Sequence, residues 1–259
     1  MYIKKYVIVF DLDETIGHFN QPYNFWYFLK KFLNVEYIDE KYFHSFLDLF
    51  PEFFRTNILK ILKFIKKKKI SGVCDHVMIY TNNNGPKYWV NFIKSYIHKK
   101  LNYELFDQII SAFKINGEIV EKNRTSYNKS HKDFINCTKL PKNTEICFID
   151  DQHHYEMIND NVTYIYVQPY TYNIEYNKLC EKFYNKNTNL FENYNKTKEE
   201  FINYFSDKDL KYLNKSRVEK NIDLLISKNI ENNIKKFLSK KVKLTKKIKK
   251  KSNNLTHKI

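Results

Sequence analysis

The feature that most constrains this chain is the stretch Tyr6–Thr15, which reads YVIVFDLDET. Its first half, Val7–Phe10, is an unbroken apolar run rich in β-branched residues, typical of a strand buried on both faces in a parallel sheet. The run ends abruptly in the carboxylates of Asp11, Asp13 and Glu14. Such carboxylates are costly unless a cation meets them, and open α/β sheets bind ligands beyond the carboxyl ends of their strands. The stretch therefore predicts an α/β fold with a site at this strand end; the alternative is an acidic turn that caps the next element.

Composition limits the size and setting of the fold. With 259 residues, 42% of them apolar, the chain is long enough for one α/β domain with an appendage or for two small domains. Its net charge of +16 accompanies a general bias toward Lys, Asn, Ile and Tyr, which weakens the charge as evidence for nucleic-acid binding. The four cysteines form no CxxC pair, so we expect reduced thiols. The sequence shows no signal peptide or membrane span, and we expect a soluble protein of the cytoplasm or nucleus.

A second apolar run predicts an anion site. Val77–Tyr80 is followed by Thr81, Asn82 and a short loop, and then by a helix expected from about residue 87 to residue 100. Free backbone N–H groups at a helix N-terminus attract anions, and the Thr81 hydroxyl adds a donor. The alternative is an ordinary loop that caps the helix.

A third apolar run repeats the acidic strand end. Glu145–Ile149 ends in Asp150 and Asp151. Two acidic strand ends in one dry site would repel each other unless a divalent cation lay between them, and a site made of oxygen ligands suits Mg²⁺. His153 and His154 follow directly, and we assign them to the surface because an all-oxygen site does not need them.

The remaining elements are helical or short. We expect helices across residues 21–69, the first part of which (21–50) forms an insertion that could cover the site. We also expect a strand near residues 106–113, a hairpin at 115–120, a strand at 162–167, and helices at 175–183, 198–205 and 221–238. Residues 1–170 would thus form the main domain. Residues 171–259 would form a helical, Lys-rich extension, with a tail from about residue 239 whose order is left open.

The ordered set of motifs resembles a known superfamily. DLDET after a buried strand, a strand that ends in Thr81, a downstream lysine and a strand that ends in Asp150 and Asp151 resemble the haloacid dehalogenase superfamily of phosphohydrolases. The DLDET and DD motifs look most like the NLI-interacting-factor-like group, which acts on the carboxy-terminal domain of RNA polymerase II. The resemblance covers about residues 6–167. It implies a Rossmann-like parallel sheet and a Mg²⁺-dependent phosphoryl transfer through an aspartyl-phosphate intermediate.

The resemblance also implies roles for individual residues. Asp11 would be the nucleophile, and Asp13 the general acid and base. Lys132, which precedes a short helix expected at about residues 132–137, would neutralise the site, with Lys129 as its rival. The phosphate would be bound by Thr81, Asn82 and Lys132. The Mg²⁺ would be held by Asp11, the main-chain carbonyl of Asp13, Asp150 and Asp151.

Two other functions stay open at this point. The chain could be a catalytically idle binding module whose Lys-rich tail binds nucleic acid or an acidic partner, with strong salt dependence. It could also be a phosphatase of nucleic-acid ends, in which tail and site cooperate. The retained Asp13, which binding alone would not require, favours a phosphatase of unknown substrate, protein or small molecule.

Overall fold

The computed structural model describes residues 4–206 and 215–256, and their side chains except those of residues 87 and 244–256. Within this part, five parallel strands form a sheet in the order β3-β2-β1-β6-β7. The strands are β1 (Tyr6–Phe10), β2 (His76–Tyr80), β3 (Gln108–Ile110), β6 (Glu145–Asp150) and β7 (Val162–Tyr166). The predicted α/β fold with a central parallel sheet is confirmed, and the YVIVF run is its middle strand.

Alternation along β1 divides the core into two layers. Tyr6, Ile8 and Phe10 belong to the larger cluster of buried apolar side chains, while Val7 and Val9 belong to the smaller one on the other face. The smaller cluster is covered by α5 (His131–Thr138). The larger one is covered by helices that include α3 (Ile58–Ile70), α4 (Lys87–Leu101) and α9 (Arg217–Thr256). Because both faces are covered, every residue of β1 is buried.

The insertion after β1 is helical, as predicted. It contains α1 (Asn20–Leu33), α2 (Glu40–Leu49) and a 3₁₀ turn at Pro51–Phe53, before α3 leads back to the sheet. Asp39 caps α2, because its carboxylate accepts a hydrogen bond from the backbone N–H of Lys41. The other short elements are the hairpin β4 (Lys114–Ile115) with β5 (Glu118–Ile119) and a 3₁₀ turn at Tyr155–Met157.

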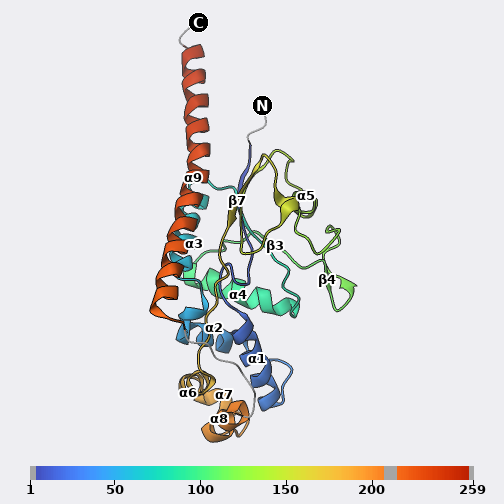
Figure 1. Cartoon of the computed structure of the whole chain (residues 1–259), viewed down its shortest axis with the longest axis vertical. Coiled ribbons are helices and arrows are strands. Elements are labelled where there is room, and N and C mark those ends of the chain that lie inside the picture. Colours follow the sequence, from blue (N-terminus) through green and yellow to red (C-terminus); the bar gives the residue numbers. More distant parts are fainter. Residues whose placement is uncertain (1–3, 207–214, 257–259) are drawn as a thin grey trace.

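Aromatic side chains join the insertion to the chain after β7. That later segment forms α6 (Tyr176–Lys186), α7 (Thr188–Glu192) and α8 (Lys198–Ser206), which lie beside α1 in Figure 1. The ring of Phe25 in α1 stacks on Phe46 of α2 at 4.6 Å between centroids and meets Phe183 at 5.3 Å. The inserted helices and the C-terminal helices therefore share one apolar core.

Helix α9 runs along the sheet and then past it. The Phe237 ring packs on Tyr6 at 5.4 Å, and the Lys241 ammonium pairs with Asp75, just before β2. Both contacts lie at the amino ends of the strands. Beyond them the helix projects from the body of the molecule (Figure 1). No helix in the described part of the chain is long and apolar enough to cross a membrane.

Candidate active site

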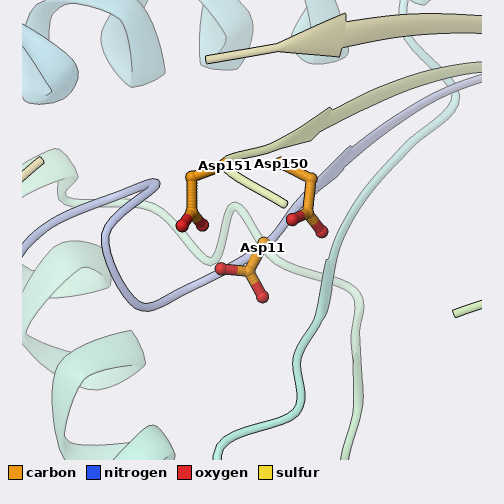
Figure 2. Close-up of side chains that lie close together, drawn as sticks. All are labelled: Asp11, Asp150 and Asp151. Atoms are coloured by element: carbon orange, nitrogen blue, oxygen red, sulfur yellow. The ribbon is translucent and has the colours of Figure 1, made fainter. Parts of the chain in front are cut away.

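Three carboxylates meet at the carboxyl end of the sheet. β1 and β6 are parallel neighbours in register, with Phe10 opposite Ile149, so the residues that follow them emerge side by side. Figure 2 shows the side chains of Asp11, Asp150 and Asp151 converging there. Their ligand oxygens lie within 4.8 Å of one another, and all three residues are buried. The structure thus brings together the two acidic strand ends that the sequence placed about 140 residues apart.

Lys129 is the cation of this cluster. Its ammonium donates hydrogen bonds to Oδ1 of Asp11 and, at 2.7 Å, to Oδ2 of Asp150, and its side chain is 2% exposed. It stands just before α5, whose N-cap is Ser130: the Ser130 hydroxyl accepts a hydrogen bond from the Asp133 N–H. Our preferred residue, Lys132, lies in the first turn of α5 and is exposed. The lysine that the sequence analysis held as its rival therefore occupies the site.

Burial and mutual contact shift the pKa values of these groups. Burial raises the pKa of Asp11 to about 8, against the opposing effect of Lys129. Burial acts in the same direction on Asp150, but the nearby His154 ring and the hydrogen bonds from Lys129 and the Gln152 N–H outweigh it and lower the Asp150 pKa. The two carboxylates that share Lys129 thus have unequal affinity for a proton.

Asp13 stands apart from the three-carboxylate cluster. Its Oδ2 accepts a hydrogen bond from the side-chain amide of Asn83 at 2.7 Å. Burial raises the pKa of Asp13, and the Asn83 amide opposes that effect. A raised carboxyl pKa beside Asp11, the predicted nucleophile, agrees with the predicted role of Asp13 as general acid. Asn83 is not among the predicted site residues, because its position two residues after Thr81 gave no separate signal.

Arg124 holds the loop after β2. The guanidinium donates to the main-chain oxygens of Thr81 at 3.2 Å and Ser111 at 2.8 Å, and to the Asn82 side-chain oxygen at 2.8 Å. The Thr81 hydroxyl in turn accepts a hydrogen bond from the Asn83 N–H at 2.9 Å. Asn82, predicted to bind phosphate, thus has its side-chain oxygen engaged by arginine.

The site opens into a cavity of about 520 Å³. Its lining includes Asp11, Asp13, Thr81 and Lys129 and, from α1 of the insertion, Asn20, Tyr23 and Asn24. This cavity is large enough for a small phosphate ester and reaches the predicted nucleophile. Its α1 wall is consistent with the predicted cover over the site.

One of the two histidines placed on the surface by the sequence analysis is in fact buried. The side chain of His154 is 8% exposed, and its Nε2 lies 3.5 Å from Oδ2 of Asp150. His153 is exposed and stacks on Tyr166 with 4.0 Å between ring centroids. The two histidines differ because the turn after β6 brings His154 back against the Asp150 carboxylate.

Two buried arginines were also missed as site residues. Arg55 is 1% exposed and Arg124 is 2% exposed, and both bind the loops that carry the acidic and polar residues. The rarity of arginine could have indicated them, because only three of the 45 lysines and arginines are arginines. In so Lys-biased a chain, a retained arginine suggests a need for its planar fork of donors.

Comparison with known proteins adds little to this geometry. No family model matches the chain, and no curated protein matches it. Among solved structures, the chain is similar to the HAD domain of the effector protein Lem4 from Legionella pneumophila. The sequences are 15% identical, the TM-score is 0.41, and the match covers 71% of this chain and 95% of that one.

Proposed function

We propose that this protein is a Mg²⁺-dependent phosphohydrolase that works through a phosphoryl group carried on Asp11. One observation carries the proposal: Asp11, Asp150 and Asp151 share a buried cluster with Lys129 at the edge of a cavity that Asp13 and Thr81 also line. The order of these motifs in the chain resembles the haloacid dehalogenase phosphohydrolases, which supports the same reading.

The donor set fits a magnesium ion. With all three carboxylates ionised, the buried cluster would have a net charge of about −2 even with the Lys129 ammonium. That charge is costly without a cation, which agrees with the raised pKa of Asp11. The three residues of the cluster offer carboxylate oxygens, which is the ligand type that Mg²⁺ prefers. Asp11, Asp150 and Asp151 would hold the ion. When bound, magnesium would reduce the repulsion between the Asp11 carboxylate and the anionic phosphate.

The side chains support a two-step transfer. In the first step an Asp11 oxygen attacks phosphorus, the bond from phosphorus to the ester oxygen breaks, and Asp13 gives its proton to the leaving oxygen. In the second step Asp13 takes a proton from water as that water attacks phosphorus. The bond to Asp11 then breaks and inorganic phosphate is released. Lys129 offsets negative charge in both steps, and the Thr81 hydroxyl is a donor for phosphate oxygens.

Hydrolysis of p-nitrophenyl phosphate tests the proposal. We expect wild-type activity that requires Mg²⁺ and is lost with EDTA, and an Asp11→Asn loss of at least about 10³-fold because the amide is a poor nucleophile. Asp160→Asn, at an exposed aspartate, is the matched control and should keep wild-type activity. Equal activity of the Asp11→Asn variant and the wild type would reject the nucleophile. A panel of phosphopeptides, nucleotides and sugar phosphates would then identify the substrate class.

A further inference from the structure

Arg55 ties together two loops behind the active site. It follows the 3₁₀ turn of the insertion and is 1% exposed. Its Nε donates to the main-chain oxygen of Thr15 at 2.6 Å, and its Nη2 donates to those of Glu14 at 2.6 Å and Gln168 at 2.8 Å. The first two acceptors belong to the loop after β1, and the third to the loop after β7.

The loop after β1 has a conformation that needs support. Glu14 has a φ of +59°, a left-handed value that non-glycine residues rarely adopt. Its N–H donates to the Gly17 oxygen at 2.7 Å, and its own oxygen also accepts from the Tyr170 N–H at 2.8 Å. Gly17 cannot be replaced easily, because a Cβ there would lie 2.5 Å from the Phe53 oxygen. The insertion and the β7 loop together hold this turn.

The same turn sets one carboxylate of the cluster. The Thr15 hydroxyl donates to Oδ1 of Asp151 at 3.0 Å and accepts from the Asp151 N–H at 3.1 Å. Arg55 binds the main-chain oxygen of that threonine. A change in the turn would therefore move the Thr15 hydroxyl and with it the Asp151 carboxylate.

The C-terminal extension supports Arg55 from the far side. The Arg55 guanidinium and the Lys215 ammonium both lie over the Tyr170 ring, at 5.5 Å and 4.5 Å from its centroid. Lys215 also donates to the Thr171 oxygen at 2.8 Å and pairs at 2.6 Å with Asp223, which is 5% exposed on α9. Burial lowers the pKa of Arg55 to about 10, and the negative charge of Asp223 opposes that effect. Arg55 thus stays protonated at neutral pH.

We propose that Arg55 is a positioning residue that sets the loop from Asp11 to Gly17, and through Thr15 the Asp151 carboxylate. We also propose that Asp223 of α9 supports Arg55 through Lys215 and the Tyr170 ring. The C-terminal extension is then part of the catalytic unit, although it contributes no residue to the cavity wall described above. This inference rests on the proposed function for its catalytic consequence, while the support of the loop itself can be measured without catalysis.

Variants on α9 and at Arg55 test the inference. Arg55→Lys keeps the charge but loses the fork that binds three carbonyl groups. Asp223→Asn leaves Arg55 intact but removes the carboxylate that pairs with Lys215. Glu231→Gln is the matched control, because Glu231 lies on the same helix and its ion pair is with Lys235, one turn away on α9. We expect the first two to raise the Mg²⁺ concentration for half-maximal activity by about tenfold or more, as for groups that orient metal ligands.

Two further measurements separate positioning from folding and from activity. Hydrogen exchange should be faster for the amides of residues 12–18 in Asp223→Asn, with unchanged far-UV circular dichroism, and the Mg²⁺-induced rise in Tm should shrink. The control should match the wild type in all three measurements. Should Arg55→Lys not fold, Asp223→Asn alone decides the matter.

The inference is overturned if a folded Asp223→Asn protein keeps wild-type exchange in residues 12–18, or keeps the wild-type response to Mg²⁺. A wild type without phosphatase activity would instead count against the proposed function. In that case the exchange and Tm measurements still decide whether α9 supports the loop and the Asp151 carboxylate.

Discussion

Lys129 shows how strongly a buried charge depends on its neighbours. Its ammonium would be expensive to bury alone, yet Asp11 and Asp150 outweigh the effect of burial and raise its pKa. The same contact lowers the cost of burying the two carboxylates. Removal of one partner from such a cluster leaves the other charges buried and unpaired. This costs more stability than replacing the whole cluster with apolar side chains.

Two lysine variants that differ only by position test this point. Lys129→Met should reduce phosphatase activity by at least about 100-fold and destabilise the metal-free protein by about 3 kcal/mol. Lys132→Met, three residues later and exposed, should change neither. Activity assays and urea unfolding of both variants provide the measurement. If Lys132→Met loses activity and Lys129→Met does not, the assignment of the site lysine is reversed.

Asp13 should matter most when the leaving group is poor. An alkyl phosphate releases an alkoxide that needs a proton, whereas p-nitrophenolate leaves without much help. Asp13→Asn should therefore lower kcat/KM by about 100-fold or more for an alkyl phosphate, and clearly less for p-nitrophenyl phosphate. The value of kcat/KM reports the first transfer step, in which the leaving group departs. An equal loss for both substrates would show that Asp13 does not protonate the leaving oxygen.

At the scale of elements, α9 is held by ion pairs at both ends of its packed half. Asp223 pairs with Lys215, which donates to the Thr171 oxygen after β7, and Lys241 pairs with Asp75 near the amino ends of the strands. Between them the apolar contacts are made by Ile230, Ile234, Phe237 and Leu238, all buried. The i, i+4, i+7 and i+8 spacing of these four residues places them on one face of the helix.

The Asp75 contact gives a pH prediction. Burial acts to raise the pKa of Asp75, but hydrogen bonds from Lys241 and the Tyr6 N–H outweigh it, so the pKa in the folded state is lowered. A lowered carboxyl pKa adds stability above the unfolded value, near about pH 4, which is lost as the pH falls through the folded value.

Asp75→Asn should thus be less stable than the wild type at pH 7 by about 1 kcal/mol, and the difference should shrink below about pH 4. Urea unfolding at several pH values would show it. A difference that stays constant down to pH 2 would mean that the charge of Asp75 is not what matters.

At the scale of the whole molecule, the site and the basic end of α9 lie at opposite ends of the sheet. The carboxylates follow the carboxyl ends of β1 and β6, while α9 passes the amino ends at Tyr6 and then projects away (Figure 1). One molecule therefore does not present its lysine-rich helix end to its own cavity. A polyanion bound to the lysine-rich end of α9 would be a partner distinct from the substrate in the cavity. We propose nucleic acid as that partner.

Truncation after Lys243 tests that partner. It removes six lysines and leaves Phe237, Leu238 and Lys241 in their packed positions, whereas a cut after Lys235 would remove part of the core. We expect the shortened protein to keep its phosphatase activity and to bind DNA and RNA more weakly. The slope of log K against log salt should fall by about 0.9 for each lost phosphate contact on duplex DNA. Unchanged affinity across salt concentrations would exclude the tail as the binding element.

The sequence by itself determined the class of fold and the acidic part of the site. The buried run Val7–Phe10 requires a two-sided cover, and carboxylates at the ends of parallel strands must meet at one edge, so Asp11 and Asp150 could be paired from local patterns alone. The helices of the insertion followed from apolar spacing in the same way. These features depend on short-range periodicity and on one topological rule.

Only the tertiary structure decided which cations serve that site. Lys129 and Lys132 were both candidates for the site lysine, since each lies close to the start of the same short helix. The turn before α5 buries Lys129, whereas Lys132 is exposed. His154 meets Asp150 through a turn of 4 residues, and Arg55 meets Thr15 across about 40 residues. Neither contact could be predicted from the apolar and polar pattern of the sequence. Burial makes such pairings energetically decisive, because a buried charge must find a partner, and which partner lies within reach depends on how distant segments pack.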